Sequence, residues 1–156
     1  DKAQAVANVQ AILADKPADM IITTHVCRGN YKSSYLLTGA YDPVADGLFG
    51  QTNYDGYFLE YDDERLGGFE PLKHFANNKG RVVLGLISSK FPELEDKEAI
   101  KARIQEAAKY VPLEQLCLSP QCGFASTEEG NVMTEAQQWA KVRHVEEIAK
   151  EVWGED

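Results

Sequence analysis

The segment from Arg81 to Ile87 (RVVLGLI) constrains the fold more than any other part of the sequence. It is a β-branched and apolar run without alternation, which is typical of a strand buried on both faces of a parallel sheet. Shorter strands of the same kind are expected at 20–24, ending at His25, and at 56–60 and 116–119. These segments predict a parallel sheet.

Helical segments separate the expected strands. Asp42-Pro43 is typical of a helix start, with Asp as the cap and Pro at the first helical position. Thr134 and Gln137 are spaced as in a capping box before the last helix, which should run to about Trp153. The other helices are expected at 4–14, 42–49, 70–77 and 96–110. The predicted order is therefore one helix, then strand and helix four times, an α/β fold with helices covering the sheet.

Two arrangements of such βα units compete, an open doubly wound sheet and part of a TIM (β/α)8 barrel. Residues 27–30 (CRGN) follow the first strand without the glycine spacing of a dinucleotide-binding loop, which weakens the first arrangement. A complete barrel needs about 250 residues. We therefore interpret residues 1–156 as a single domain or fragment that forms the C-terminal half of a barrel. Half a barrel exposes two sheet edges, so a homodimer through those edges is a further expectation.

Composition excludes two classes of partner. The net charge is −9, and no cluster of Lys and Arg resembles a phosphate-binding surface, so we expect no nucleic acid partner. The longest apolar runs have about half a dozen residues, far too few for a membrane span. Three cysteines, an odd and low number, favour a reducing cytoplasm over a disulfide framework. The chain lacks a signal-peptide pattern and does not start with Met, so we expect a processed product or an expressed fragment.

Metal-binding residue types follow three of the expected strands. The first strand ends in His25 and Cys27, the second ends in Glu60, and the fourth leads into Cys122. In a parallel βα array the carboxyl ends of all strands meet at one rim, so these side chains should lie close together. Thiolate, imidazole and carboxylate are all zinc ligands. The sequence therefore predicts a Zn²⁺ site.

Each of these residues, taken singly, also has a less specific interpretation. Glu60 could belong to a solvated acidic loop that continues to Glu64. A lone Cys in a strand, such as Cys117, is more often a small apolar filler. His74 and His144 are expected to be surface or hydrogen-bonded residues. The zinc hypothesis rests on the coincidence of donors at three strand ends.

Three segments resemble the cobalamin-independent methionine synthase family, and most closely its short bacterial branch of single-barrel proteins. They are 24–30 (THVCRGN), 58–62 (FLEYD) and 118–123 (LSPQCG). The similarity covers essentially the whole chain and corresponds to the C-terminal half of the catalytic barrel. It implies that His25, Cys27, Glu60 and Cys122 hold zinc. It also implies that the zinc binds the sulfur of homocysteine, which attacks the methyl group of a methyltetrahydrofolate.

The donor set itself favours thiol chemistry. A free thiol has a pKa near 8.5, so only a few per cent of it is thiolate at neutral pH. Coordination to zinc removes that proton. Two thiolates and a carboxylate keep the site electron-rich, which favours alkylation of a bound thiol over activation of water, where sites are richer in His.

The sequence also departs from the family. Ser88 is the expected equivalent of a His that is thought to act as the general acid toward the folate. Gln121 replaces an Asp, and residues 124–126 replace basic residues. These changes leave three hypotheses: zinc-dependent methyl transfer to a thiol from a folate, alkyl or methyl transfer from a non-folate donor, and a non-catalytic zinc-binding module. The partners of either enzyme are a small-molecule thiol and a methyl donor.

Two polar residues beside the expected ligands are candidates for substrate binding. Arg28 and Asn30 could hold a substrate carboxylate, for which the guanidinium geometry is suited. The alternative for Arg28 is an ion pair with a neighbouring Asp or Glu that fixes the loop.

Overall fold

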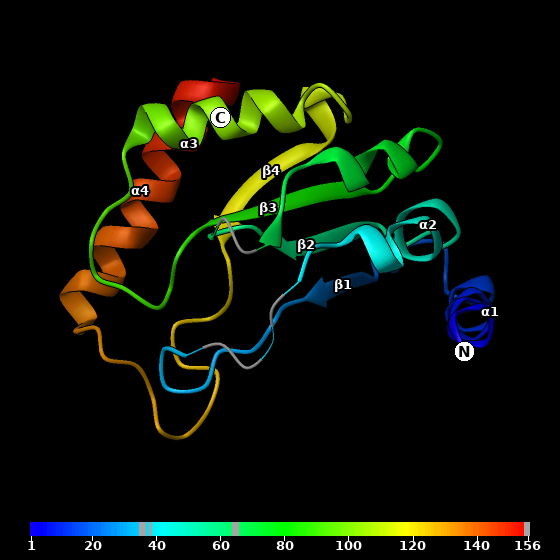
Figure 1. Ribbon diagram of the computed structural model, residues 1–156, viewed down its shortest axis with the longest axis horizontal. Helices are drawn as coiled ribbons and strands as arrows, with labels where there is room; N and C mark the ends of the chain where they lie inside the picture. Colours follow the sequence, from blue (N-terminus) through cyan, green and yellow to red (C-terminus); the bar gives the residue numbers. More distant parts are fainter. Residues whose placement is uncertain (35–36, 38, 64–65, 155–156) are drawn as a thin grey trace.

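Four parallel strands with helices between them form the core of the protein. The computed structural model describes residues 1–34, 37, 39–63 and 66–154. The strands are β1 (Thr23–Val26), β2 (Gly56–Glu60), β3 (Arg81–Ile87) and β4 (Leu116–Pro120). The helices are α1 (Lys2–Ala14), α2 (Asp42–Gly50), α3 (Lys97–Ala107) and α4 (Glu135–Trp153), with 3-10 helices η2 (Glu70–Phe75) and η3 (Leu113–Gln115). The strands pair in chain order, β1-β2-β3-β4, which confirms the parallel α/β prediction (Figure 1).

The two faces of the sheet have different environments. Tyr57 and Leu59 of β2 are buried in a core that also contains Phe49 of α2 and Ile104 of α3. Phe58, between those two strand residues, points the opposite way and is 37% exposed. The helices thus cover one face, and the face that would line the interior of a closed barrel remains open at β2. The fold is a partial TIM barrel, as the sequence predicts.

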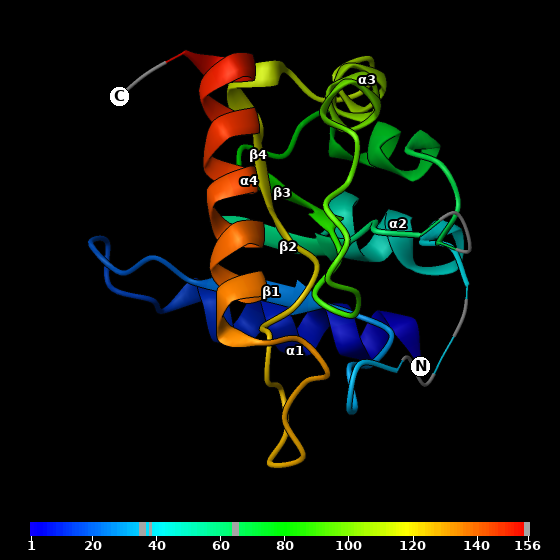
Figure 2. The same ribbon diagram turned by 90° about the vertical axis from the view of Figure 1, so that its left-hand side faces the viewer.

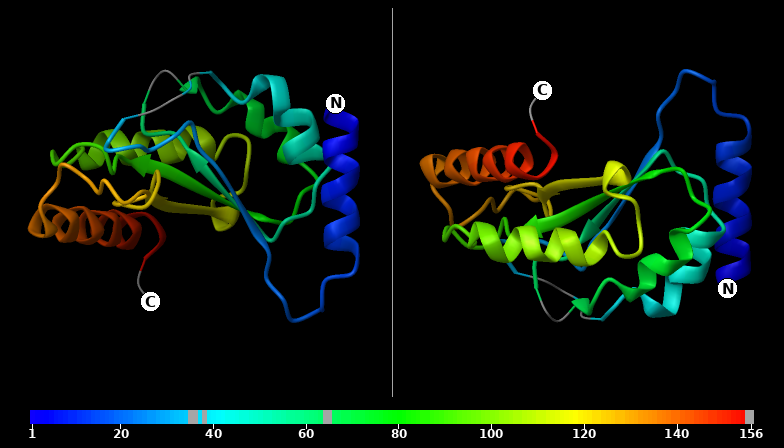
Figure 3. Two further views of the ribbon diagram at one scale, coloured as in Figure 1. Left: turned by 90° about the horizontal axis from the view of Figure 1, so that it is seen from below. Right: turned by 90° about the horizontal axis from the view of Figure 1, so that it is seen from above.

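The helices at the two ends of the sheet are arranged differently (Figure 3). α3 and α4 lie side by side at the β4 end, whereas α1 packs against α2 at the other end. The capping box predicted before α4 is present at Thr134 and Gln137, and it fixes where that helix begins. α3 ends at Ala107 instead of residue 110, because the chain tightens into turns in which Tyr110 N–H donates to Ala107 O. Within the described ranges, no helix has both the length and the apolar character needed to cross a bilayer.

The predicted first strand, 20–24, is wrong in its position. The strand pairs only from Thr23, and Ile21 is 79% exposed. The carboxylate of Asp55 explains the late start, since it accepts from the Ile22 N–H at 2.8 Å and from Lys16 Nζ at 2.7 Å. The Ile22 N–H is therefore bonded to a side chain, while Ile22 O accepts from the backbone N–H of Asp55 at 2.8 Å. β1 extends through His25 to Val26.

The loops that follow β1 and β4 lie side by side (Figures 1 and 2). Tyr31 donates to Glu129 at 3.0 Å, and Ser33 lies within hydrogen-bond distance of Asn131 at 3.1 Å. Asn131 in turn donates to Ser89 O, so the β4 loop is also attached to the end of β3. These bonds join segments almost 100 residues apart at the carboxyl rim of the sheet.

Gly85 in the middle of β3 is required by close packing on both sides. A Cβ at this position would lie 2.7 Å from Leu59 O and 2.7 Å from the Cα of Gln121. We expect Gly85→Ala to reduce the free energy of unfolding by about 2 kcal/mol, because a strand and a rim loop must both shift. Urea unfolding measures the change. Gly68→Ala is the matched control, since its Cβ would meet nothing within 4 Å; equal stability losses in the two variants would contradict the packing argument.

Candidate metal site

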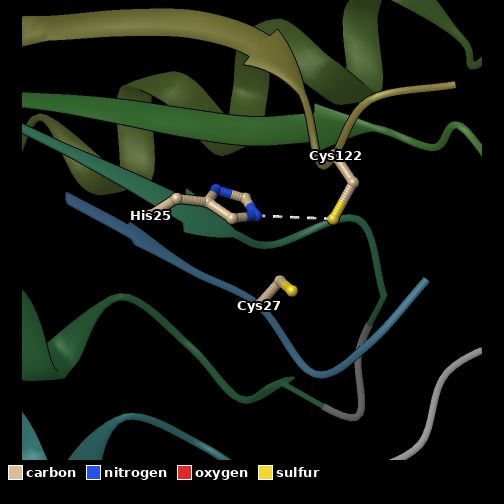
Figure 4. Close-up of side chains that lie close together, drawn as sticks. All are labelled: His25, Cys27 and Cys122. Carbon is tan, nitrogen blue, oxygen red and sulfur yellow. Dashed lines mark hydrogen bonds between the residues drawn. The ribbon is translucent and has the colours of Figure 1, made fainter. Parts of the chain in front are cut away.

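Three of the four predicted ligands form a compact cluster. The imidazole of His25 and the thiols of Cys27 and Cys122 place one ligand atom each within 4.8 Å of the others. His25 Nε2 lies 3.5 Å from Cys122 Sγ (Figure 4). His25 is exposed, and both thiols are half-buried. The cluster therefore has one open side.

The position of the cluster depends on the curvature of the sheet. His25 belongs to β1 and Cys122 follows β4, and these strands are the two edges of the sheet. In a flat sheet three inter-strand gaps of about 4.8 Å would separate the edges by roughly 14 Å. Contact between His25 and Cys122 therefore requires the strands to curl toward each other at the rim, as they do in a barrel.

Cys122 is held in place through its neighbour Gln121. The Gln121 side chain is 1% exposed, and its Oε1 accepts from Ser89 N at 2.7 Å and from Ser89 Oγ at 2.6 Å. The backbone N–H of Gln121 donates to Ile87 O at 2.8 Å. Gln121 thus fixes the loop after β4 to the end of β3, directly before the thiol.

Glu60, the fourth predicted ligand, lies outside the cluster in this structure. Its side chain is 1% exposed, and Oε1 forms an ion pair of 2.9 Å with Lys90 Nζ. Oε2 accepts from the backbone N–H of Arg28. The backbone N–H of Glu60 donates to the hydroxyl of Tyr41 at 2.8 Å. Both carboxylate oxygens therefore have partners other than a metal.

Lys90 is the residue at this rim that sequence reasoning missed. Its side chain is 2% exposed, and Nζ lies 2.9 Å from Glu60 Oε1 and 3.2 Å from Asp62 Oδ2. A lysine is almost never fully buried unless it is paired. The sequence does contain a signal for this residue. Lys90 comes shortly after the most apolar strand, so it lies at the carboxyl rim, near the acidic residues at the end of the neighbouring strand β2.

Ser88 forms hydrogen bonds with neighbouring residues and does not belong to the cluster. Its backbone N–H donates to Glu95 Oε1 at 2.8 Å, and its Oγ accepts from the Lys90 N–H at 3.2 Å. Glu95 is in turn paired with Lys141 of α4 at 2.9 Å, and His144 Nε2 lies 2.7 Å from Glu95 O. These bonds shape the turn that brings Lys90 toward Glu60.

The two predicted substrate-binding residues differ in what they contact. Asn30 Nδ2 donates to Gly123 O at 2.8 Å and to Ser126 Oγ at 3.0 Å, so the amide joins the loops after β1 and β4. The guanidinium of Arg28 lies over the ring of Tyr41, 4.5 Å from its centroid, and its Nε donates to Gly39 O at 3.2 Å. The Arg28 side chain is thus placed by an aromatic ring and a carbonyl group.

Electrostatics favour the neutral form of Cys122 in the absence of a cation. Burial, with smaller contributions from the neighbouring Cys27 and Glu60, raises the pKa of the Cys122 thiol to about 12, against an opposing effect of Lys90. A dication would reverse this balance, since thiolate is the form that binds metal. Two thiols and an imidazole suit zinc, which prefers sulfur and nitrogen donors in tetrahedral geometry.

The cluster opens onto the uncovered face of the sheet. His25, Phe58, Ser119 and Cys122 line a hollow of about 360 Å³ there. The lining of the hollow thus includes an aromatic ring and two residues of the cluster.

Comparisons with known proteins assign the chain to a family. The profile of the catalytic domain of cobalamin-independent synthases matches residues 1–150. The chain belongs to the cobalamin-independent methionine synthase family. This result confirms the resemblance seen in the three sequence segments around the predicted ligands.

Relatives in the family are longer than this chain. It is 56% identical over 146 residues to the uncharacterized protein YxjG of Bacillus subtilis, covering 94% of this chain and 39% of that protein. For YxjH of the same organism the identity is 57% over 141 residues, covering 90% and 37%. The chain thus spans about two fifths of the length of these curated relatives.

Solved structures agree with the fold. A protein of Listeria monocytogenes assigned as a vitamin-B12-independent methionine synthase superposes with a TM-score of 0.76 at 47% identity, over 99% of this chain and 42% of that one. A B12-independent methionine synthase of Shewanella sp. W3-18-1, solved with selenomethionine, gives a TM-score of 0.73 at 19% identity, over 94% and 42%. The second match supports the fold alone.

The raised pKa of Cys122 predicts slow alkylation of this thiol in chelator-treated protein. At pH 8 iodoacetamide should modify Cys122 far more slowly than a cysteine in an unfolded peptide, and the rate should rise with pH toward about 12 as thiolate forms. Mass spectrometry of the Cys122 peptide gives the rate. Urea-unfolded protein is the control; a rate at Cys122 that already matches it at pH 8 would contradict the effect of burial.

Proposed function

We propose that this chain is the zinc-bearing half of a methyltransferase that activates a homocysteine-like thiol for methyl transfer. The observation that carries the proposal is the cluster of His25, Cys27 and Cys122 at the carboxyl rim of a partial barrel. Catalytic groups gather at this rim in TIM-barrel enzymes. Family membership supports the reaction class.

The proposed ligands are His25, Cys27 and Cys122, with Glu60 as a fourth ligand that exchanges with substrate. Bound zinc would supply a Lewis acid that keeps a substrate thiol deprotonated at neutral pH. These residues would hold the ion beside the hollow and would leave the exposed side of the cluster accessible. Three permanent protein ligands and one exchangeable position are the pattern of catalytic zinc sites.

Substrate binding would use the surroundings of the cluster. Arg28 directly follows Cys27, and its planar guanidinium suits a substrate carboxylate, so we retain it as the candidate for that contact. Asn30 would act by holding together the loops that frame the hollow, since its amide bonds to Gly123 and Ser126. Phe58 offers an apolar wall on the open face of the sheet.

The methyl donor has two candidates, a methyltetrahydrofolate and a non-folate compound. Ser88, the expected equivalent of the family's general acid, has no acid function near neutral pH, and its N–H and Oγ bond to Glu95 and the Lys90 backbone. Gln121 uses its side-chain oxygen to hold Ser89. Neither residue replaces the acid of the family, which favours a non-folate donor as the second candidate function.

A structural zinc module is the rival of a different class. Structural sites are usually closed by four protein ligands and rarely use a carboxylate. The exposure of His25 and the hollow beside Cys122 favour an open site instead.

The activity would belong to the longer protein, because this chain spans about two fifths of its relatives. The other half of the barrel would cover the open face of the sheet and complete the hollow. In its absence we propose that a second copy covers the exposed edges. A reducing, cytoplasmic setting is consistent with three free cysteines, two of which lie in the cluster.

Removing one ligand should abolish stoichiometric zinc binding. We expect Cys122→Ser to lower zinc affinity by about 100-fold or more, since loss of a mere outer-shell partner already costs about 10–100-fold. Metal analysis of purified protein and competition with a chelator measure this change. Cys117→Ser is the matched control, because Cys117 contacts Arg81 and lies outside the cluster. Wild-type protein that binds no zinc would overturn the proposal.

Turnover by the full-length protein tests the reaction. We expect methylation of homocysteine that depends on zinc and is lost in Cys122→Ser, with a non-folate methyl donor supporting a higher rate than methyltetrahydrofolate. Product formation is followed by mass spectrometry with each donor. A higher rate with methyltetrahydrofolate would refute the argument from Ser88 and Gln121. Zinc binding without any methyl transfer to thiols, and a ligand sphere unchanged by millimolar thiol, would favour the structural module.

A further inference from the structure

Lys90 connects the metal site to a buried group of charges. One ammonium group faces two carboxylates, Glu60 at 2.9 Å and Asp62 at 3.2 Å, and all three side chains are at most 3% exposed. Asp62 Oδ1 is buried without a hydrogen-bond partner among the described residues. The group therefore contains more negative charge than its single cation balances, and it lies within electrostatic reach of Cys122.

The contacts fix the orientation of the Glu60 carboxylate. Oε1 is held by Lys90, and Oε2 is held by the N–H of Arg28, the residue after Cys27. Removing one partner of a buried ion pair leaves an uncompensated charge, which favours a new contact with another cation. Lys90 and a metal ion held by the cluster would therefore draw on the same carboxylate.

We propose that Lys90 is a positioning residue that competes with the metal ion for the carboxylate of Glu60. Since the ion pair stabilises Glu60 away from the cluster, coordination by Glu60 is weak and reversible. The fourth position therefore stays open to a substrate thiol, and Lys90 accepts the carboxylate when the thiol arrives. This inference rests on the proposed function, because it requires zinc in the cluster.

A simple charge effect must be separated from this competition. Removing any cation near the cluster favours binding of a dication, with or without Glu60. Competition for Glu60 predicts something more specific: Lys90 affects metal affinity only while the Glu60 carboxylate is present. A double-mutant cycle isolates that dependence.

The experiment measures zinc affinity in the full-length protein by competition with a chelator. We expect Lys90→Met to bind zinc about tenfold more tightly than wild type, since outer-shell partners change metal affinity by about 10–100-fold. In a Glu60→Gln background the same substitution should change the affinity less than about threefold. Lys101→Met is the control, because Lys101 of α3 is half-buried and pairs with Glu98 and Glu151 instead of Glu60 and Asp62; it should leave zinc affinity unchanged.

A second readout follows the exchange directly. In Co²⁺-substituted protein, the absorption change on adding homocysteine should need about tenfold more thiol in Lys90→Met than in wild type, because the carboxylate no longer has an alternative partner. If Lys90→Met does not fold, Lys90→Gln retains a polar donor at the site and should show a smaller change in the same direction.

The possible outcomes separate the role of Lys90 from the proposed function on which it rests. An equal gain in zinc affinity with and without the Glu60 carboxylate, or no gain at all, would overturn the role of Lys90 while leaving the zinc site intact. A wild-type protein that binds neither zinc nor Co²⁺ at the cluster would remove both the inference and the proposed function.

Discussion

The meeting of the two edge strands at one rim is the constraint on which the rest of the structure depends. A flat sheet of four strands would keep the backbones of β1 and β4 roughly 14 Å apart, whereas side-chain atoms of His25 and Cys122 lie only 3.5 Å apart. The curl that brings them together is secured by contacts between the loops after β1 and β4, such as Asn30 with Gly123. Because the same curl creates the open concave face, the hollow and the cluster share one geometric origin.

At the rim, acidic groups lie beside a buried cation, and a bound metal ion would change this balance of charge. The structure brings two thiols and an acidic group together and supplies one buried cation, Lys90, beside them. Burial is the main reason that the raised pKa keeps Cys122 protonated in the metal-free protein; Cys27 and Glu60 add to this effect and Lys90 opposes it. A dication would convert the cluster to its thiolate form and at the same time compete with Lys90 for Glu60. Metal binding and the position of Glu60 are therefore linked, and the substrate thiol would enter this balance as a third competitor.

Local patterns in the sequence predicted most of the fold, whereas tertiary contacts decided the remainder. The apolar run of β3 and the capping box at Thr134 were sufficient signals, because each depends on neighbours along the chain. The start of β1 was not predictable in this way, since the Asp55 carboxylate that holds Ile22 comes from a distant turn. The same applies to the site: strand-end reasoning gathers His25 and both cysteines, but the engagement of Glu60 by Lys90 requires knowledge of side-chain burial.

The position of the cluster also links metal binding to the stability of the partial barrel. An ion held by His25, Cys27 and Cys122 would cross-link the first and last strands of the sheet, and metal-binding free energy of this kind contributes to folding. In a complete barrel the other strands would impose the curvature through hydrogen bonds. Within the described residues, the contacts between the loops after β1 and β4 support this curvature. The residues proposed to activate a thiol would thus also hold the sheet in the curved form on which their own proximity depends.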